Sequence, residues 1–251
     1  MNNVHDAAIV IPLKKQSDKR GLSGLRAPGL LAQRPWIGLL MVLLGGLVYG
    51  AIATSVQTNG PLIQLDVPVS NAIHAAALQS SLVVRDLMIL GFYVGEHLIV
   101  AIGALLAVYF LYKRFWPELG MVVIAWAGEG AIWLFLSQYY NRPRPVFDVP
   151  VWHQMTSPGF PSGHVIAAVM CYGLLAYLLI PKSSSRFWKI AISVMAGLII
   201  LYIGVSRLFV GDHYLSDVLA GYALGIAWSG LVYTVIELIT MKRMNGHVQE
   251  K

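Results

Sequence analysis

The stretch PSGHVIAAVMCYGLLAYLLI, residues Pro161–Ile180, joins a short polar motif to a long apolar run. A helix needs about 20 predominantly apolar residues to cross the hydrocarbon core of a bilayer. This run reaches that length if it begins near the motif, which places Ser162, Gly163 and His164 at the mouth of a membrane span. Polar groups in a bilayer are costly and often functional, so the imidazole at this position indicates a site.

The composition of the whole chain agrees with a membrane protein. The 251 residues are 57% hydrophobic and 12% charged, and the mean hydropathy is +0.66, whereas a soluble domain carries about 25% charged residues. We therefore expect an all-α, polytopic helical bundle of one domain. The single cysteine, Cys171, lies inside an apolar run, which excludes a disulfide framework.

Six segments are long and apolar enough to be spans. They are Trp36–Val56, Gly91–Tyr112, Met121–Tyr140, Val165–Ile180, Trp188–Arg207 and Asp217–Thr240. We place the spanning domain at residues 36–241, between a polar, flexible tail at residues 1–35 and a short tail at residues 242–251. We expect the tail at residues 1–35 to stay uncleaved, because a signal peptide has a much shorter basic region before its apolar core.

The connection between the first two spans has its own pattern. The sequence VSNAIHAAALQSSLVVRDLMIL, within residues 57–90, has helical spacing and predicts one helix lying at the membrane interface. Arg85 and Asp86 fit a local surface pair in this helix.

The basic residues are divided unevenly between the two sides of the predicted bundle. If the N-terminus is inside, the inner segments hold Lys14, Lys15, Lys19, Arg20, Arg26, Arg34, Lys113, Arg114, Lys182, Arg186, Lys189, Lys242, Arg243 and Lys251. Only Arg85, Arg142, Arg144 and Arg207 lie outside. The positive-inside rule therefore predicts that both termini are cytoplasmic. The same sorting explains the net charge of +6 without a nucleic-acid partner.

Three outer stretches collect most of the reactive side chains. They are NRPRP (Asn141–Pro145), PSGH (Pro161–His164) and SRLFVGDHYLSD (Ser206–Asp217). The predicted topology brings all three to one face of the membrane, although they are far apart in the sequence. We expect them to form one site.

The residue types in these stretches suit a phosphate group. The guanidinium forks of Arg144 and Arg207 match tetrahedral oxyanions. Ser162 and Gly163 precede a helix, so their backbone N–H groups can point at an anion. We therefore predict a phosphate pocket from these four residues.

Two histidines in the same stretches predict catalysis. Asp217 follows His213 by four residues, so its carboxylate can bond one ring nitrogen and leave the other free to attack. His164 is a second imidazole, placed to protonate a leaving oxygen. Asp217 alone could instead cap the sixth span, and Ser216 is a better candidate for a residue that only caps.

These motifs resemble those of the type 2 phosphatidic acid phosphatase (PAP2) family, which shares active-site motifs with vanadium haloperoxidases. The family patterns are K-x6-R-P, P-S-G-H and S-R-x5-H-x3-D. The second pattern matches at Pro161–His164, and the third matches in full at Ser206, Arg207, His213 and Asp217. The first matches only at Arg144 and Pro145, because Ser137 stands where the pattern has lysine.

The resemblance implies a PAP2-like core and a metal-independent hydrolase that needs no cofactor. It implies that His213 is the nucleophile and forms a phosphohistidine, that Asp217 orients it, and that His164 is the general acid and then the base for water. Arg144, Arg207, Ser162 and Gly163 would hold the phosphoryl oxygens.

The departure at Ser137 raises the question of which cation replaces the lysine. Arg142 is the nearest, and we predict that it also binds phosphate. Glu96 and Glu129, which lie inside predicted spans, fit either a polar contact between helices or a path for a proton or substrate.

Two functions remain open at this point. The first is a lipid phosphatase of a bacterial inner membrane whose site faces the periplasm or exterior, acting on phosphatidic acid, phosphatidylglycerophosphate, diacylglycerol pyrophosphate or undecaprenyl pyrophosphate. The second is a non-catalytic or transport protein that kept a phosphate pocket; the missing lysine and the two glutamates favour it, whereas the intact His213 and Asp217 favour the enzyme.

Overall fold

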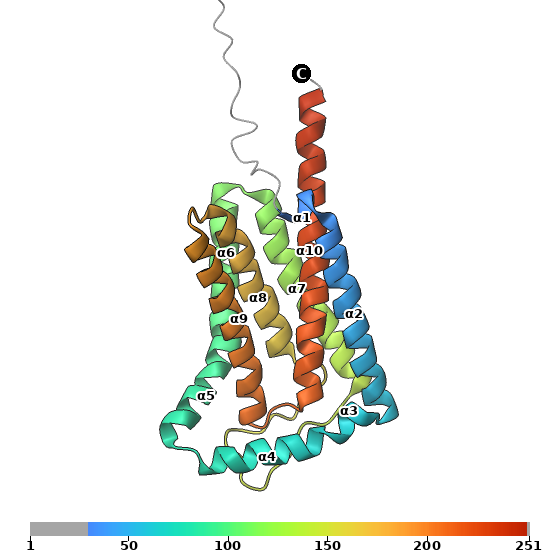
Figure 1. The fold of residues 1–251 in the computed structure, drawn as a ribbon, viewed down its shortest axis with the longest axis vertical. Helices are drawn as coiled ribbons and strands as arrows, with labels where there is room; N and C mark the ends of the chain where they lie inside the picture. The colour runs from blue at the N-terminus through green and yellow to red at the C-terminus, as the bar shows by residue number, and fades with distance from the viewer. Residues whose placement is uncertain (1–29, 250–251) are drawn as a thin grey trace, which may run out of the picture.

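The computed structural model describes residues 30–249; residues 1–29 and 250–251 lie outside the described part of the chain. The described part is helical, as Figure 1 shows. Its helices are α1 (Leu30–Gln33), α2 (Pro35–Thr58), α3 (Pro61–Gln64), α4 (Asp66–Gln79), α5 (Leu82–Gly95), α6 (His97–Lys113), α7 (Trp116–Tyr140), α8 (Gly163–Leu179), the 3₁₀ turn η1 (Ile180–Lys182), α9 (Arg186–Phe209) and α10 (Leu215–Gln249).

Six helical stretches are long and apolar enough to cross a membrane, which confirms the predicted all-α bundle with six spans. They are α2, α5 together with α6, α7, α8 together with η1, α9, and α10 as far as Lys242. Many leucines and valines on their outer faces are exposed, as expected where lipid replaces water. The chain is an integral membrane protein.

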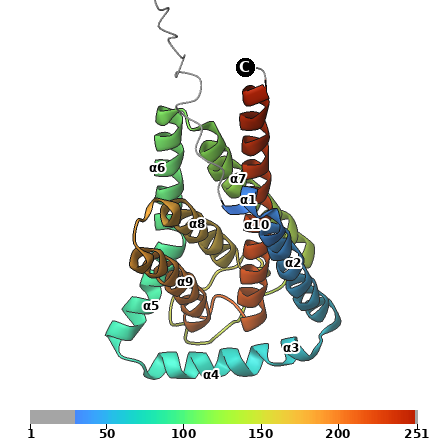
Figure 2. The ribbon, with the colours of Figure 1, turned by 45° about the horizontal axis from the view of Figure 1, so that its top comes forward.

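The connection between the first two spans differs from the single interfacial helix that we predicted. The stretch that we predicted as one helix forms two, α4 and α5, because the backbone is extended at Ser80 and Ser81. The Ser81 hydroxyl accepts a hydrogen bond from the Val84 N–H at the start of α5. Only α4 runs across the end of the bundle (Figures 1 and 2), whereas α5 turns back into the second span. Arg85 does not depend on Asp86: it donates to the backbone oxygens of Ala77 and Leu78 at the end of α4.

The second span is broken at Glu96, between α5 and α6. This residue has φ −126° and ψ −74°, which is neither helical nor extended backbone. Its carboxylate forms no capping hydrogen bond to the first turn of α6. The break therefore places the Glu96 side chain inside a membrane span. Because this side chain does not cap α6, it can bond a partner on another helix.

Small residues allow the first and last spans to pack closely. A Cβ on Gly45 of α2 would lie 2.6 Å from the Ala223 oxygen of α10, and a Cβ on Gly230 of α10 would lie 2.7 Å from the Met41 Cβ. Close backbone approach of this kind is a usual basis of helix association in lipid. The pairing holds α2 along α10.

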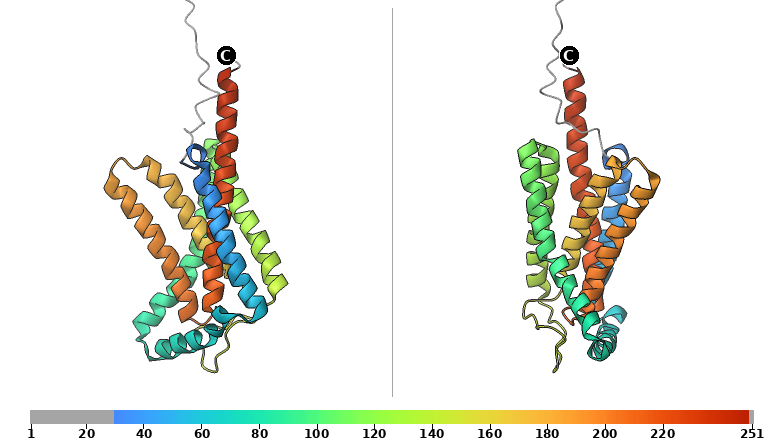
Figure 3. Two further views of the ribbon diagram at one scale, coloured as in Figure 1. Left: turned by 45° about the vertical axis from the view of Figure 1, so that its right-hand side comes forward. Right: turned by 90° about the vertical axis from the view of Figure 1, so that its left-hand side faces the viewer.

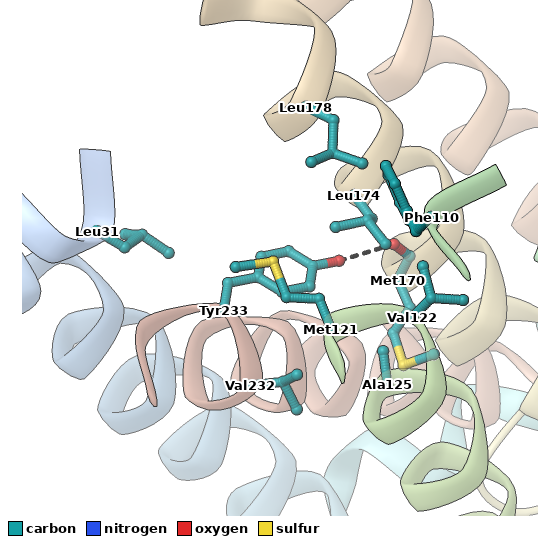
Figure 4. Packing of buried hydrophobic residues seen from close by; sticks show 10 residues of the cluster. All are labelled: Leu31, Phe110, Met121, Val122, Ala125, Met170, Leu174, Leu178, Val232 and Tyr233. Atoms are coloured by element: carbon teal, nitrogen blue, oxygen red, sulfur yellow. Dashed lines mark hydrogen bonds between the residues drawn. The ribbon is translucent and has the colours of Figure 1, made fainter. Parts of the chain in front are cut away.

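A hydrophobic cluster fills the half of the bundle that lies away from α4. Figure 4 shows its members, which come from α1, α6, α7, α8 and α10: Leu31, Phe110, Met121, Val122, Ala125, Met170, Leu174, Leu178, Val232 and Tyr233. The Tyr233 hydroxyl donates to the Met170 oxygen at 2.8 Å. This core joins the spans that carry the site.

The two ends of the bundle are different in character. The C-terminal part of α10 projects from the end where α1 lies, while α3, α4 and the loops after α7 and α9 gather at the opposite end (Figures 1 and 3). The helix continues past residue 242, where we predicted a tail. Of the predicted N-terminal tail, residues 1–29 lie outside the described residues, and Leu30–Gln33 form α1.

Candidate active site

The three predicted motif stretches meet at the end of the bundle that α4 covers. The first occupies the start of the loop between α7 and α8, the second joins that loop to α8, and the third joins α9 to α10. The junction of α9 and α10 is short because Gly211 adopts φ +82°, a left-handed conformation that glycine accepts without strain. The turn places the next residues, Asp212 and His213, in the interior of the site.

His213 is held in one tautomer by its two neighbours. Its Nδ1 lies 2.8 Å from the backbone oxygen of Gly159, and its Nε2 lies 3.0 Å from Nη1 of Arg144. A carbonyl oxygen can only accept a hydrogen bond and a guanidinium can only donate one. Nδ1 therefore carries the proton, and Nε2 presents a lone pair.

The surroundings of His213 also keep it neutral. The residue is 1% exposed. Burial, reinforced by the positive charges of Arg144 and Arg207, holds the pKa of His213 well below its ordinary value of 6.5. The Nε2 lone pair is therefore unprotonated at neutral pH, as a nucleophile requires.

Asp217 lies beside His213 but does not bond it directly. Its Oδ2 is 3.6 Å from Nδ1, beyond ordinary hydrogen-bond distance, because Gly159 takes the ring proton. Oδ2 instead accepts the backbone N–H of Tyr214 at 2.9 Å. Tyr214 immediately precedes α10, so Asp217 both caps the helix and sets its negative charge behind the imidazole.

Arg142, which we predicted to bind phosphate, has acceptors within the protein. Its guanidinium donates to Asp217 Oδ1 at 2.5 Å, to Ser216 Oγ at 2.6 Å and to Asp66 Oδ2 at 2.7 Å. These acceptors engage both terminal nitrogens of Arg142 on the Asp217 side of the His213 ring. The geometry therefore favours a contact that orients Asp217, while phosphate binding by Arg142 stays a prediction.

Asp66, the first residue of α4, completes this group. It is 1% exposed and accepts hydrogen bonds from the Ser216 N–H at 2.9 Å and the Ser216 hydroxyl at 2.5 Å, in addition to the bond from Arg142. Buried charges are stable only when they are paired and hydrogen-bonded. The helix across the end of the bundle is thereby tied to the first turn of α10, next to the nucleophile.

Arg144 and Arg207 lie close to the face of His213 that carries the lone pair. Arg144 is oriented by the backbone oxygens of Ser157 and Asp212, both at 2.8 Å. Arg207 is fully buried and bonds Asp212 Oδ2 at 3.0 Å. Asp212 thus holds one arginine by its side chain and the other by its backbone.

Two buried polar atoms at this face have no hydrogen-bond partner among the residues that the structure describes: Ser162 Oγ and Arg207 Nε. We expected the backbone N–H of Ser162 to point at an anion, but it donates to the backbone oxygen of Asp217 at 3.1 Å. The group of Ser162 that is left for an anion is its hydroxyl. Gly163 begins α8, whose first-turn N–H groups have no acceptor within the helix.

Ser137, at the position of the family lysine, is 1% exposed in the last turn of α7. Its hydroxyl donates to the Leu134 oxygen of the same helix at 3.1 Å. It therefore supplies no charge to the site. The two guanidiniums of Arg144 and Arg207 are the cations gathered beside His213.

His164 lies on the opposite side of the site from the Asp217 group. Its ring centroid is 6.4 Å from that of His213. Its Nε2 is 3.1 Å from Oε2 of Glu96, the residue at the break of the second span. The second histidine of the site is therefore paired with a carboxylate.

A cavity of about 330 Å³ opens beside His164. It lies between α5, α6, α7, α8 and the loop before α8, and its lining includes Glu96, Glu129, Arg144 and Trp133. Gly128, next to Glu129, packs against Trp228 of α10, where a Cβ would meet the ring at 2.2 Å. The close contact with α10 is thus made by the glycine, while Glu129 lines the cavity.

The site holds residues that sequence patterns did not reveal. Gly159 contributes only a backbone oxygen, and Asp66 lies 147 residues before His213 in the chain. The one signal for Asp66 in the sequence was an aspartate at the start of a helical pattern. It carries little information, because aspartate is common at helix starts. Within residues 30–249, no group of three or more His, Cys, Asp or Glu side chains is placed to hold a metal ion.

Comparison with known proteins agrees with the motifs. The family model of the PAP2 superfamily matches residues 118–240. Phosphatidylglycerophosphatase B of Bacillus subtilis (strain 168) is 35% identical over 132 residues, which are 51% of this chain and 61% of that protein. The match thus spans less than two thirds of that relative's length.

Solved structures show the same likeness. The crystal structure of a transmembrane PAP2 type phosphatidylglycerolphosphate phosphatase from Bacillus subtilis matches with a TM-score of 0.60 and 29% identity, over 78% of this chain and 93% of the other. The LpxE structure from Aquifex aeolicus is more distant, with a TM-score of 0.48 and 20% identity over 71% of this chain and 95% of the other. The predicted resemblance to the PAP2 family is confirmed.

Proposed function

We propose, from the match of residues 118–240 to the PAP2 superfamily, that this chain is a metal-independent lipid phosphatase. The observation that carries the proposal is the tautomer of His213. A buried, neutral imidazole with its proton fixed on Nδ1 by Gly159 directs a lone pair from Nε2 toward the guanidinium of Arg144, and the positive charge of Arg207 acts on the same ring. That arrangement suits attack on a phosphorus atom whose oxygens the arginines hold.

In the first step, Nε2 of His213 attacks the phosphorus and a P–N bond forms. The bond from phosphorus to the lipid oxygen breaks, and His164 gives its proton to that oxygen. Arg144 and Arg207 stabilise the charge on the equatorial oxygens, with the Ser162 hydroxyl as a further donor. The two ring centroids are 6.4 Å apart, so both histidines can act on one bound phosphoryl group.

In the second step, water attacks the phosphohistidine. His164, now neutral, accepts a proton from this water, the P–N bond breaks, and inorganic phosphate leaves. The negative charge of Asp217 behind the ring stabilises His213 while it carries the phosphoryl group. The cycle returns both histidines to their starting states without a metal ion.

The proposed substrate is a lipid phosphomonoester, with phosphatidylglycerophosphate as the first candidate. The similar curated protein and the similar crystal structure, both from Bacillus subtilis, are named for that substrate. Phosphatidic acid and the two lipid pyrophosphates are the other candidates. The cavity beside His164 is mostly apolar and is bordered by membrane-spanning helices, which suits a lipid leaving group.

The direct test measures phosphate release from these four lipids in detergent micelles containing a chelator, with the wild-type protein and the His213→Ala variant. We expect the wild type alone to release phosphate, and phosphatidylglycerophosphate to be hydrolysed with the highest kcat/KM. Binding of lipid phosphate without release would favour the non-catalytic alternative. Loss of activity in chelator would contradict metal independence.

We further propose that the site faces the periplasm or exterior and that both termini are cytoplasmic. The sorting of basic residues supports this orientation. In the fold, α1 and α4 lie at opposite ends of the bundle (Figure 1), and the site lies at the end of α4. In a Cys171→Ala background, a membrane-impermeant thiol reagent should label cysteine at exposed position Asp148 in intact cells. It should not label cysteine at Ser184, which is equally exposed at the other end. The reverse labelling would overturn the orientation.

A further inference from the structure

We infer that Glu96 is a positioning residue for the general acid: its carboxylate holds His164 by Nε2, so that Nδ1 delivers the proton to the leaving oxygen. This inference rests on the proposed function and adds a residue that lies outside all three family motifs. The contact that carries it is the 3.1 Å distance between Nε2 and Glu96 Oε2.

The place of Glu96 in the fold indicates a specific partner. It lies at the break between α5 and α6, inside the membrane-spanning stretch Leu82–Lys113. A carboxylate in such a stretch is expensive and usually has a specific partner. Its side chain does not cap α6, and the partner that the structure gives it is His164.

The carboxylate of Glu96 determines which ring nitrogen of His164 keeps its proton. An ionised carboxylate can only accept a hydrogen bond, so the contact places a proton on Nε2 of His164. When Nδ1 is also protonated the ring is an imidazolium, and the adjacent negative charge stabilises it. When Nδ1 has given its proton away, the neutral ring keeps Nε2–H on Glu96 and presents the Nδ1 lone pair to water. One contact thus serves both steps.

His164 lies among positive charges that Glu96 opposes. The other charged or titratable groups that act on its ring are Arg207 of α9 and His213 of the loop before α10. Arg144 and Glu129 line the same cavity. Arg144 and Arg207, which the phosphate needs, repel an imidazolium. Glu96, in direct contact, is the group that offsets this repulsion before the substrate binds.

The test compares substrates that need a general acid with one that does not. An alkyl phosphate has a poor leaving group and depends on the proton, whereas p-nitrophenyl phosphate releases a stable anion. General acid catalysis contributes about 10²–10⁴-fold, and we expect Glu96→Gln, which has the same shape without the charge, to lose about tenfold or more of kcat/KM on a short-chain phosphatidic acid. On p-nitrophenyl phosphate, whose leaving group needs no proton, Glu96→Gln should keep nearly the wild-type kcat/KM.

A series of aryl phosphates with increasingly poor leaving groups makes the result quantitative. The ratio of wild-type to Glu96→Gln activity should rise steadily along the series, and Glu96→Asp, which keeps the charge, should fall between the two. The control is Asp86→Asn, which removes one carboxylate from the exposed face of the same helix, α5, and should match the wild type on every substrate.

An equal loss on all substrates would overturn the inference, because it would show a general structural role. So would full activity of Glu96→Gln on alkyl phosphates. Failure of the proposed function itself is distinguishable, since the wild type would then hydrolyse none of the substrates. If Glu96→Gln does not fold, Glu96→Asp is compared with the wild type along the same series, and its smaller loss should again grow as the leaving group becomes poorer.

Discussion

The two histidines of the site are held by opposite ring nitrogens and by acceptors of different charge. His213 donates a hydrogen bond from Nδ1 to a neutral backbone oxygen, that of Gly159, and its Nε2 lone pair faces Nη1 of Arg144. His164 is engaged through Nε2 by a carboxylate, that of Glu96, which leaves Nδ1 for chemistry. A neutral acceptor suits a nucleophile that must stay unprotonated, and an anionic acceptor suits an acid that must carry a proton.

The surroundings of the two rings differ in the same sense. His213 is 1% exposed and is held by Gly159 and Arg144 of the loop after α7, with Asp217 of α10 beside it. The side chain of His164 is 15% exposed and opens onto the cavity of about 330 Å³. A nucleophile gains from rigid, dry surroundings, since its attack depends on geometry. The acid has to reach a leaving group that belongs to a lipid, and the cavity gives that group room.

The largest effect expected from this comparison is the contrast between the two alanine variants. His213→Ala should reduce hydrolysis of every substrate to background, because no other group can form the covalent intermediate. His164→Ala should lose about 10²–10⁴-fold on lipid substrates but keep measurable activity on p-nitrophenyl phosphate. Steady-state assays on both substrates measure this. Equal and complete loss in both variants would remove the distinction between the two roles.

A smaller effect is expected behind the nucleophile, at Arg142. The Arg142→Ala change leaves Asp66 and Asp217 buried without their shared cation, and breaking a buried pair in this way costs about 3–5 kcal/mol of stability. We expect a lower melting temperature and about a tenfold fall in kcat, equal to about 1.4 kcal/mol, with KM little changed. The fall in kcat follows if Arg142 orients Asp217 and does not touch phosphate.

Two further variants separate this role from phosphate binding. Arg144→Ala should change KM as well as kcat, because Arg144 faces the phosphate. Ser137→Lys should not restore Arg142→Ala, since a lysine there cannot replace the bonds to Asp66 and Asp217. A rise in KM in Arg142→Ala, reversed by Ser137→Lys, would return Arg142 to the phosphate pocket.

The smallest effect concerns pH. Because burial and Arg144 lower the pKa of His213 below 6.5, the nucleophile becomes protonated only in more acidic solution. Activity should therefore rise with pH along an acidic limb of kcat/KM whose midpoint lies below 6.5. Two substrates whose phosphate groups ionise at different pH separate the enzyme limb from that of the substrate. An enzyme limb at or above 6.5 would show that the ring is not buried as described.

Much of this architecture follows from local sequence patterns. Apolar length predicts the spans, and the motif spacing predicts that His164, Arg207, His213 and Asp217 share a site. The break at Glu96 was not predicted, because α5 and α6 form one apolar run and a single glycine such as Gly95, which precedes Glu96, is tolerated inside a helix.

The partners of Arg142 show the other limit of sequence reasoning. Its distance from Arg144 along the chain suggested a shared ligand, but the direction of its side chain is set by Asp66 on α4 and by the first turn of α10. A contact between α4 and the loop after α7 depends on how the whole bundle closes. Residue spacing within one motif carries no information about it.

Trapping the covalent intermediate tests the central claim most directly. The protein is mixed with a radiolabelled lipid phosphate, quenched within one turnover, and mapped by digestion and mass spectrometry. We predict a phosphoryl group on His213 that is labile in acid and stable in base, as a P–N bond is, and that is absent from the His213→Ala variant. An acid-stable adduct, an adduct on Ser162, or labelling that persists in His213→Ala would contradict the assignment of His213 as the nucleophile.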